Sequence, residues 1–238
     1  MKATALRPNN IRALNALIRE HGLGQTLPKL GKRRYPPLPS GTAEFDERLG
    51  GGFPRGVISE VTGPCSSGRT GLLLTALAQS TRAHEIAAYV DATDSLDQRS
   101  AQRAGVVLDR LLWIRCGQAA GLSGDLGQSG LACMDAAWRA ANLVVSAGGF
   151  GLVAVDLAGL PKRALGNWQR RPWLRVKHAL EGASTALVVL AEAPLAGSAA
   201  GMVLELQREH TQWQGVLGAA SIRLDVVRDR THATGVRA

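Results

Sequence analysis

One eight-residue segment has residue types spaced for binding phosphate: Gly63-Pro64-Cys65-Ser66-Ser67-Gly68-Arg69-Thr70. In the pattern G-x-x-x-x-G-K-[ST], the glycines let backbone N–H groups curl around phosphates, the lysine reaches the β- and γ-phosphates, and the hydroxyl holds Mg²⁺. The segment departs from this pattern at Arg69, which replaces the lysine. The sequence therefore predicts a nucleotide cradle made by all eight residues, with its chemistry altered at the position most closely tied to hydrolysis.

The segments on both sides of this loop have the patterns that such a cradle requires. Residues 57–62 alternate and are rich in β-branched types, which predicts a strand. Residues 71–83 have few helix breakers and a dense apolar face, which predicts a helix. The amino terminus of that helix directs free N–H groups and a partial positive charge at an anion. This order of elements favours phosphate binding over an ordinary Gly/Ser-rich turn.

A second candidate position follows from a buried strand later in the chain. Residues 152–156 (LVAVD) are a continuous apolar run that ends in Asp156. In P-loop enzymes a carboxylate at this place helps to hold Mg²⁺. We predict Thr70 and Asp156 as the metal ligands. The alternative is a buried strand that ends in a turn-forming aspartate.

From about residue 38 to residue 229 the chain resembles the core of the RecA recombinase family. Besides the loop, the resemblance is carried by the lead-in at 40–58, by YVDATDSLD at 89–97, by GVVLDRLL at 105–112 and by SIRLD at 221–225. It implies an α/β fold with a RecA-like P-loop NTPase core, in which helices flank a twisted, mostly parallel sheet. The expected order is a basic N-terminal helix and arm (1–34), a proline-rich linker (35–40), the core (41–230) and a mobile tail (231–238).

Three positions depart from the family together. RecA proteins carry a catalytic glutamate two residues after the aspartate that matches Asp91, and this chain has Thr93 there. A hydroxyl does not act as a general base near neutral pH as a carboxylate does. RecA proteins also carry a glutamine that senses the terminal phosphate, and Glu192 at the matching position repels a triphosphate. With the larger, planar side chain of Arg69, these changes predict a site for ATP and Mg²⁺ in which hydrolysis is weak or lost.

A short RecA relative with an altered nucleotide site resembles the ImuA family. That family belongs to a damage-inducible mutagenesis cassette with an inactive polymerase homologue and a translesion polymerase. The resemblance implies a bacterial DNA-damage-response protein whose partners are RecA, the polymerase-like protein, the translesion polymerase and single-stranded DNA. Two other functions stay open: an active ssDNA-dependent ATPase of the RecA family, and a SulA-like inhibitor of cell division.

The composition fits one α/β domain with short extensions. Of the 238 residues 45% are hydrophobic, enough for a sizeable core, and the three cysteines show no disulfide or zinc pattern. No apolar run approaches the roughly 18 residues of a membrane span, and the first ten residues have no apolar signal core. We therefore expect a cytoplasmic protein without a membrane partner.

The net charge of +9 is concentrated in two basic segments. Residues 1–40 hold eight basic residues and one acidic residue. A helix is predicted near their start, with Ile11, Leu14, Leu17 and Ile18 on one face. This face either docks on a partner or folds back onto the core.

The second basic segment, residues 162–178, holds six basic residues and no acidic one. It follows Asp156, where RecA proteins place a DNA-contacting loop. Basic residues interleaved with tryptophans suit phosphate contacts and base stacking. The alternative is a solvated helix face whose tryptophans, Trp168 and Trp173, pack inward. The predicted DNA-binding residues are Lys162, Arg163, Arg170, Arg171, Trp173, Arg175 and Lys177.

The last third of the chain predicts strands and a short connection. Residues 202–212 and 222–230 alternate apolar and polar residues, which is typical of paired strands. Residues 194–201 (PLAGSAAG) match RecA's second DNA loop but are neutral and small, which argues against strand exchange. The Gly/Ser-rich residues 117–130 predict a mobile loop.

Overall fold

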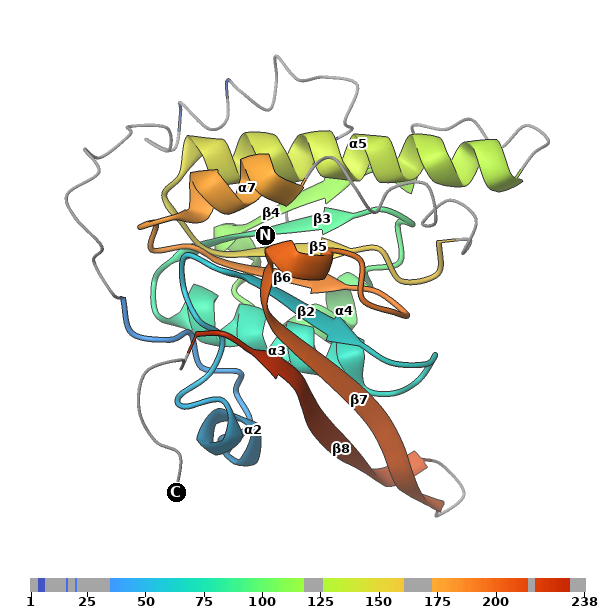
Figure 1. Cartoon of the computed structure of the whole chain (residues 1–238). Coiled ribbons are helices and arrows are strands. Elements are labelled where there is room, and N and C mark those ends of the chain that lie inside the picture. The colour runs from blue at the N-terminus through green and yellow to red at the C-terminus, as the bar shows by residue number, and fades with distance from the viewer. Residues whose placement is uncertain are drawn as a thin grey trace.

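The described part of the protein is built on one sheet with helices on both faces. The computed structural model describes residues 4–6, 16, 20, 35–117, 126–160, 173–213 and 217–231. In these residues the strands lie in the order β1-β4-β3-β5-β6-β2-β7-β8 (Figure 1). Neighbouring strands are parallel except β7 and β8, which are antiparallel. The strands are β1 (Thr4–Leu6), β2 (Ile58–Thr62), β3 (Ile86–Asp91), β4 (Leu111–Arg115), β5 (Phe150–Asp156), β6 (Ala186–Leu190), β7 (Ala200–Trp213) and β8 (Leu217–Asp229).

Two helical layers bury the faces of this sheet. Helices α5 (Leu126–Ala147) and α7 (Trp173–Leu180) cover one face, and α2 (Ala43–Arg48), α3 (Arg69–Arg82) and α4 (Gln98–Arg103) lie on the other (Figure 1). Every residue of β2, β5 and β6 is buried. Parallel strands covered on both faces have such continuous burial, which explains why their sequences are apolar runs. Two 3₁₀ turns complete the described elements: η1 (Leu108–Arg110) and η3 (Gly197–Ala199).

The elements around the loop follow the sequence prediction, and the expected α/β class is confirmed. The strand predicted at 57–62 is β2, the apolar run at 152–156 ends β5, and the helix predicted at 71–83 is α3. β6 lies between β5 and β2 and pairs with both. The carboxyl ends of these three strands therefore meet at one edge of the sheet, where ligands bind in open α/β folds.

The two strands predicted near the end of the chain are β7 and β8, and they extend beyond the sheet. β7 pairs with β2 only through Ala200–Glu205. Beyond Glu205, β7 pairs with β8 alone, as far as Trp213 opposite Leu217. We call this projecting pair the β7–β8 ribbon; Figure 1 shows it leaving the sheet below α3.

The amino-terminal part differs from the prediction in two respects. Thr4–Leu6 form a strand that pairs with β4, whereas the sequence predicts only a helix and an arm over residues 1–34. Residues 35–40 do not act as a free linker, because Leu38 is buried and its backbone forms a two-way bridge with Phe53. The helical face with Ile11, Leu14, Leu17 and Ile18 lies outside the described residues, as does most of the predicted tail.

The loop predicted at 117–130 is shorter than expected, because α5 begins at Leu126. Residues 118–125 lie outside the described part of the chain. Within the described part, no helix is long and apolar enough to cross a bilayer.

The Leu38–Phe53 bridge gives a stability prediction at Gly52. This glycine has φ +122°, and a Cβ there would lie 2.1 Å from the Leu38 carbonyl oxygen. We expect Gly52→Ala to lower the free energy of unfolding by at least about 2 kcal/mol, since both backbone strain and the collision act against it. Urea unfolding followed by circular dichroism measures the change.

Gly71→Ala is the matched control for this substitution. Gly71 lies in the first turn of α3 and nothing surrounds the added Cβ within 4 Å. It should leave stability unchanged or raise it by up to about 1 kcal/mol. Equal effects of the two substitutions would contradict the assignment of the bridge as a structural contact.

Candidate functional site

The loop between β2 and α3 has the backbone geometry of a phosphate cradle. Gly63, Ser66 and Gly68 all have positive φ, at +143°, +62° and +97°. A Cβ on Gly63 would lie 2.3 Å from the Leu206 carbonyl oxygen, and one on Gly68 would lie 2.2 Å from Ile222 Cδ1. Gly63 and Gly68 are therefore needed for two reasons: they allow the turn, and they leave room for the ribbon to pack closely against the loop. The 14-residue α3 starts immediately after Gly68 and directs its amino terminus at the loop.

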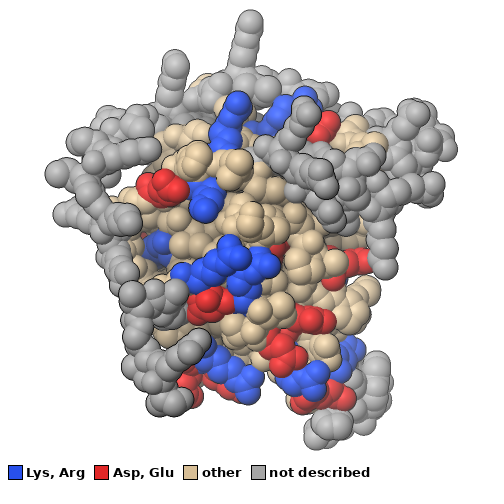
Figure 2. All heavy atoms as spheres, viewed as in Figure 1, with Lys and Arg blue, Asp and Glu red and all other residues tan. Residues whose placement is uncertain are grey.

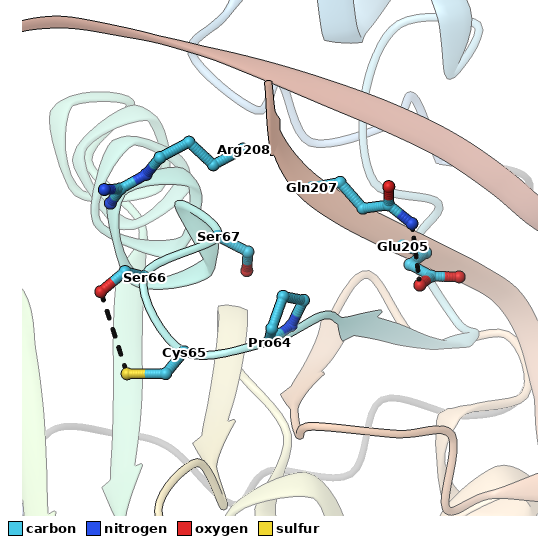
Figure 3. A pocket seen from close by; sticks show the side chains of 7 residues that line it. All are labelled: Pro64, Cys65, Ser66, Ser67, Glu205, Gln207 and Arg208. Carbon is cyan, nitrogen blue, oxygen red and sulfur yellow. Dashed lines mark hydrogen bonds between the residues drawn. The ribbon is translucent and has the colours of Figure 1, made fainter. Parts of the chain in front are cut away.

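A pocket of about 440 Å³ opens between this loop and β7. Figure 3 shows the loop residues on one side and the β7 side chains on the other. The hydroxyl oxygen of Ser67 is buried without a hydrogen-bond partner among the described residues. An unpaired buried hydroxyl next to a helix amino terminus fits an anionic ligand such as a phosphate group. The lining residues are Pro64, Cys65, Ser66, Ser67, Glu205, Gln207 and Arg208.

Arg69, the residue that replaces the lysine, is turned into the protein. Only 7% of it is exposed, and its Nη1 donates a hydrogen bond to the backbone carbonyl of Ala191, just past the end of β6. The Ala191 N–H in turn donates to the carbonyl of Val61 in β2. The guanidinium therefore joins the start of α3 to the ends of two strands, and it is not directed into the pocket beside β7.

The two predicted Mg²⁺ ligands have different environments. Thr70 is exposed at the start of α3, which fits a hydroxyl ligand. Asp156 is 2% exposed, its Oδ2 accepts a 2.6 Å hydrogen bond from the Tyr89 hydroxyl, and its Oδ1 accepts from the Ala158 N–H. Burial raises the pKa of Asp156 above its usual value, although the Tyr89 hydrogen bond opposes the shift.

Each oxygen of Asp156 accepts one hydrogen bond within the fold and keeps a second lone pair, so its role as a metal ligand stays a prediction. The predicted pair therefore joins an exposed hydroxyl at the start of α3 to a buried carboxylate at the end of β5. Elsewhere in the described segments, no group of three or more His, Cys, Asp or Glu side chains is arranged to hold a metal ion.

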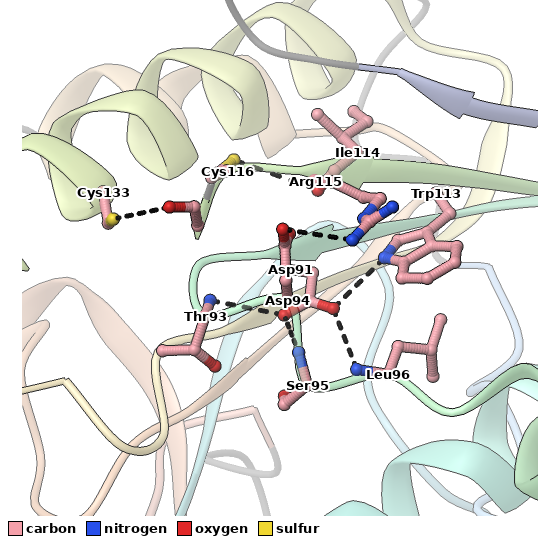
Figure 4. Close-up of polar contacts among 11 residues, drawn as sticks. Asp91, Thr93, Asp94, Ser95, Leu96, Trp113, Ile114, Arg115, Cys116 and Cys133 are labelled. Carbon is pink, nitrogen blue, oxygen red and sulfur yellow. Dashed lines mark hydrogen bonds and ion pairs between the residues drawn. The ribbon is translucent and has the colours of Figure 1, made fainter. Parts of the chain in front are cut away.

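Thr93 lies in a loop that one buried carboxylate organises. At the end of β3, Asp91 accepts hydrogen bonds from the backbone N–H groups of Thr93, Ser95 and Leu96, at 3.0–3.3 Å, and from Trp113 Nε1 (Figure 4). This fixes the turn that carries Thr93 beside the carboxyl edge of the sheet. The position is ordered, as in a catalytic loop, while its side chain supplies a hydroxyl and not a carboxylate.

Glu192 lies in a segment that four side chains hold in place. We call residues 191–199 the post-β6 segment. Arg69 binds its first carbonyl, Arg228 donates to the Gly197 carbonyl, and Arg230 donates to the Ser198 carbonyl at 3.2 Å. Glu192 itself is half-buried two residues after β6 ends. The segment overlaps residues 194–201, which the sequence predicts to match RecA's second DNA loop, and here its backbone is bonded to the core.

The fourth contact comes from Glu60, a fully buried residue of β2. Its Oε1 accepts the N–H groups of Leu195 and Ala196 at 2.6 and 2.8 Å. Its Oε2 has no hydrogen-bond partner among the described residues. Burial raises the pKa of Glu60 above its usual value, and the two backbone hydrogen bonds lower it only in part.

The predicted DNA-binding segment is described only in part. Lys162, Arg163, Arg170 and Arg171 lie outside the described residues, as does Trp168. Arg175 and Lys177 are exposed on α7, and their contact with DNA stays a prediction. Figure 2 shows basic and acidic side chains interspersed over the viewed face.

The prediction that Trp173 stacks on bases is wrong. Trp173 is 4% exposed and packs edge-on against Trp138 of α5, with ring centroids 4.4 Å apart. Both rings belong to the core beneath α5 and α7. The inward-packed alternative holds because α7 lies on the sheet through Trp173, Val176 and Leu180, at helical spacing.

Sequence reasoning missed Glu60 and Arg208. A charged residue inside a β-branched strand was an available signal for Glu60, because such a group is rarely buried without a specific partner. Arg208 gave no such signal, since an arginine in an alternating strand is ordinary. Its place beside the loop follows from the pairing of β7 with β2, which joins residues about 140 positions apart.

Comparisons with known proteins agree with this geometry. A model of the RecA N-terminal domain matches residues 11–160. Protein RecA of Enterococcus hirae is 38% identical over 157 residues, which are 64% of this chain and 41% of that protein. Protein RecA of Clavibacter michiganensis subsp. michiganensis is 36% identical over 170 residues, 69% of this chain and 42% of that protein. The chain thus spans about two fifths of the length of the curated relatives it matches.

The Glu60 environment predicts a pH dependence of stability. Because the folded state holds the Glu60 proton more tightly than the unfolded chain, the unfolded chain binds fewer protons above the ordinary pKa of 4.5. Stability is then highest below that pH and falls as the pH rises through the folded-state pKa. We expect Glu60→Gln to lose less stability than the native chain between pH 5 and pH 7, since a neutral amide oxygen still accepts both N–H groups.

Urea midpoints of both proteins at the two pH values measure this difference. Asp156 also has a raised pKa and is present in both proteins, so it cancels in the comparison. Parallel pH profiles would contradict the assignment of a buried, poorly compensated carboxylate at Glu60.

Proposed function

The chain belongs to the RecA family, and from this we propose that it is an ImuA-like DNA-damage-response protein. In this role it assists SOS-induced translesion DNA synthesis by binding RecA, a polymerase-like partner, or single-stranded DNA. Its nucleotide site keeps the cradle but has weak or absent hydrolysis. The work of the protein is then recognition, with the RecA fold used as a binding scaffold.

The orientation of Arg69 is the observation that carries this proposal. A lysine at this position reaches the β- and γ-phosphates. Arg69 instead donates a hydrogen bond to the Ala191 carbonyl, inside the protein. Stabilising the charge that develops on a transferred phosphoryl group is most of the catalysis in P-loop enzymes. A buried, protein-bound guanidinium supplies little of it.

Two further features support weak hydrolysis. Thr93 is held beside the site by the Asp91 carboxylate and has no carboxylate with which to activate water. Glu192 adds negative charge after β6, on the side where a terminal phosphate is sensed in RecA proteins. The tied post-β6 segment also argues against a DNA loop that moves with the nucleotide state.

An active ssDNA-dependent ATPase is the second candidate. The loop backbone, the exposed Thr70 and the identity to RecA proteins favour it. It requires Arg69 to leave the Ala191 carbonyl when nucleotide binds, and it requires a base other than Thr93.

Titrating this protein into the ssDNA-stimulated ATPase assay of a bacterial RecA separates the two candidates. We expect the RecA rate to fall at substoichiometric amounts, because a RecA-like chain without turnover blocks or caps a filament. A parallel reaction with this protein and DNA alone should stay flat. An unaffected RecA rate together with turnover in the parallel reaction would establish the ATPase and reject our proposal.

The DNA contact is tested by charge reversal on α7. We expect the double substitution Arg175→Glu, Lys177→Glu to weaken single-stranded DNA binding and to lower the slope of log K against log salt by about 1.4, at ~0.7 per phosphate contact. Fluorescence anisotropy of a labelled oligonucleotide at several salt concentrations measures both quantities.

The matched control reverses two exposed arginines of α4, on the opposite face of the sheet: Arg99→Glu, Arg103→Glu. It makes the same change in net charge. Equal losses in the two variants would assign the binding to net charge alone and remove α7 as a DNA contact.

A further inference from the structure

We propose that Arg208 of β7, and not Arg69, supplies the positive charge to phosphates held by the loop. The site then recognises the diphosphate of a nucleotide and does not distinguish a nucleoside triphosphate from a diphosphate. This inference rests on the proposed function, in which the loop still binds nucleotide. It assigns a specificity-determining residue outside the loop motif.

Arg208 lies across the pocket from the loop, and its guanidinium is available to bind a ligand there. It is exposed, it lines the pocket together with four loop residues, and no hydrogen bond or ion pair engages it among the described residues. Figure 3 shows its side chain running from β7 toward the part of the loop that holds Ser66. A guanidinium across a pocket from a helix amino terminus is a recurrent arrangement for binding phosphate oxygens.

The loop side of the pocket offers matching donors. The buried Ser67 hydroxyl lines the pocket without a partner, and the backbone from Ser66 to Gly68 leads directly into the first turn of α3. Free N–H groups, a hydroxyl and the α3 dipole therefore face Arg208 across the pocket. Donors on both sides suit a phosphate group bound between them.

Among the residues that line the pocket, Arg208 is the one cation and Glu205 is the one carboxylate. Gln207 Nε2 donates to Glu205 Oε1 at 3.3 Å, and Gln207 Oε1 accepts a 2.7 Å hydrogen bond from Arg223. Arg223 also forms ion pairs with Glu209 and Asp225. Glu205 thus has its own hydrogen-bond donor in Gln207, and Glu209 and Asp225 pair with Arg223, so no carboxylate of the described ribbon is paired with Arg208.

The opposite side of the loop, toward β6 and β5, is built against a terminal phosphate. Arg69 is the cation there, and it is buried on the Ala191 carbonyl. Asp156 ends β5 and Glu192 follows β6, and their carboxylates oppose further negative charge. The half of the site beside β7 attracts phosphate and the half beside β6 does not, so the third phosphate contributes little to binding.

Binding of fluorescent mant-ADP and mant-ATP to the full chain tests this inference. We expect the two dissociation constants to agree within about threefold, which is under about 0.7 kcal/mol. Arg208→Ala should weaken both nucleotides by at least about tenfold, the loss typical of a charge-assisted contact. The melting temperature should not change, because Arg208 is exposed and makes no hydrogen bond or ion pair among the described residues.

Arg139→Ala is the matched control. Arg139 is an exposed arginine of α5 on the other face of the sheet. It should bind both nucleotides as the native chain does. An equal loss in this variant would point to net charge and overturn the assignment of Arg208.

Three other results would also overturn the inference: unchanged affinity in Arg208→Ala, mant-ATP binding at least about tenfold tighter than mant-ADP, or binding of neither nucleotide at millimolar concentration. None of them depends on the RecA titration. If the chain slows RecA but binds nucleotide independently of Arg208, the proposed function stands and this inference is rejected. If nucleotide binding depends on Arg208 but RecA is unaffected, this inference stands and the proposed function is rejected.

Discussion

The hydrogen bond from Arg69 to the Ala191 carbonyl organises the site. It links the first residue of α3, the end of β6 and, through the Ala191 N–H, the end of β2. A lysine in a phosphate loop is held by its ligand, whereas this arginine is held by the protein. A contact to a charged donor stabilises by about 1.5–3 kcal/mol when buried. The loop is therefore shaped before any phosphate arrives, and its cation is already committed.

Side chains also hold the rest of the post-β6 segment by hydrogen bonds to its backbone. Arg69 comes from α3, Glu60 from β2, Arg228 from β8 and Arg230 from just after β8, and each satisfies a backbone group of residues 191–199. A segment whose polar groups are bound to the core loses the freedom that a ligand-gated loop needs. At this edge of the sheet, fixed contacts to the core hold the segment. Such a surface presents one constant shape to a partner.

The sequence was sufficient for the parts of the site that are local. The strand, loop and helix around Gly63 and Gly68 are adjacent in the chain, so periodicity and motif spacing predicted them. Contacts between distant residues were out of reach: Arg69 meets Ala191 and Glu60 meets Leu195 across more than 120 positions. The prediction of base stacking by Trp173 failed for another reason. A tryptophan among basic residues has the same local sequence pattern whether it faces solvent or packs against Trp138.

The β7–β8 ribbon adds a mechanical dimension to the site. Its pairing with the sheet ends at Glu205, and Arg208 lies three residues farther out, where β7 pairs only with β8. Two-stranded segments without a third strand have low local stability. The ribbon rests on the loop through Ile222 at Gly68 and Leu206 at Gly63. A ligand bound between Arg208 and the loop therefore restricts the motion of the ribbon. A partner that binds the far end of the ribbon would in turn change how tightly the nucleotide is held.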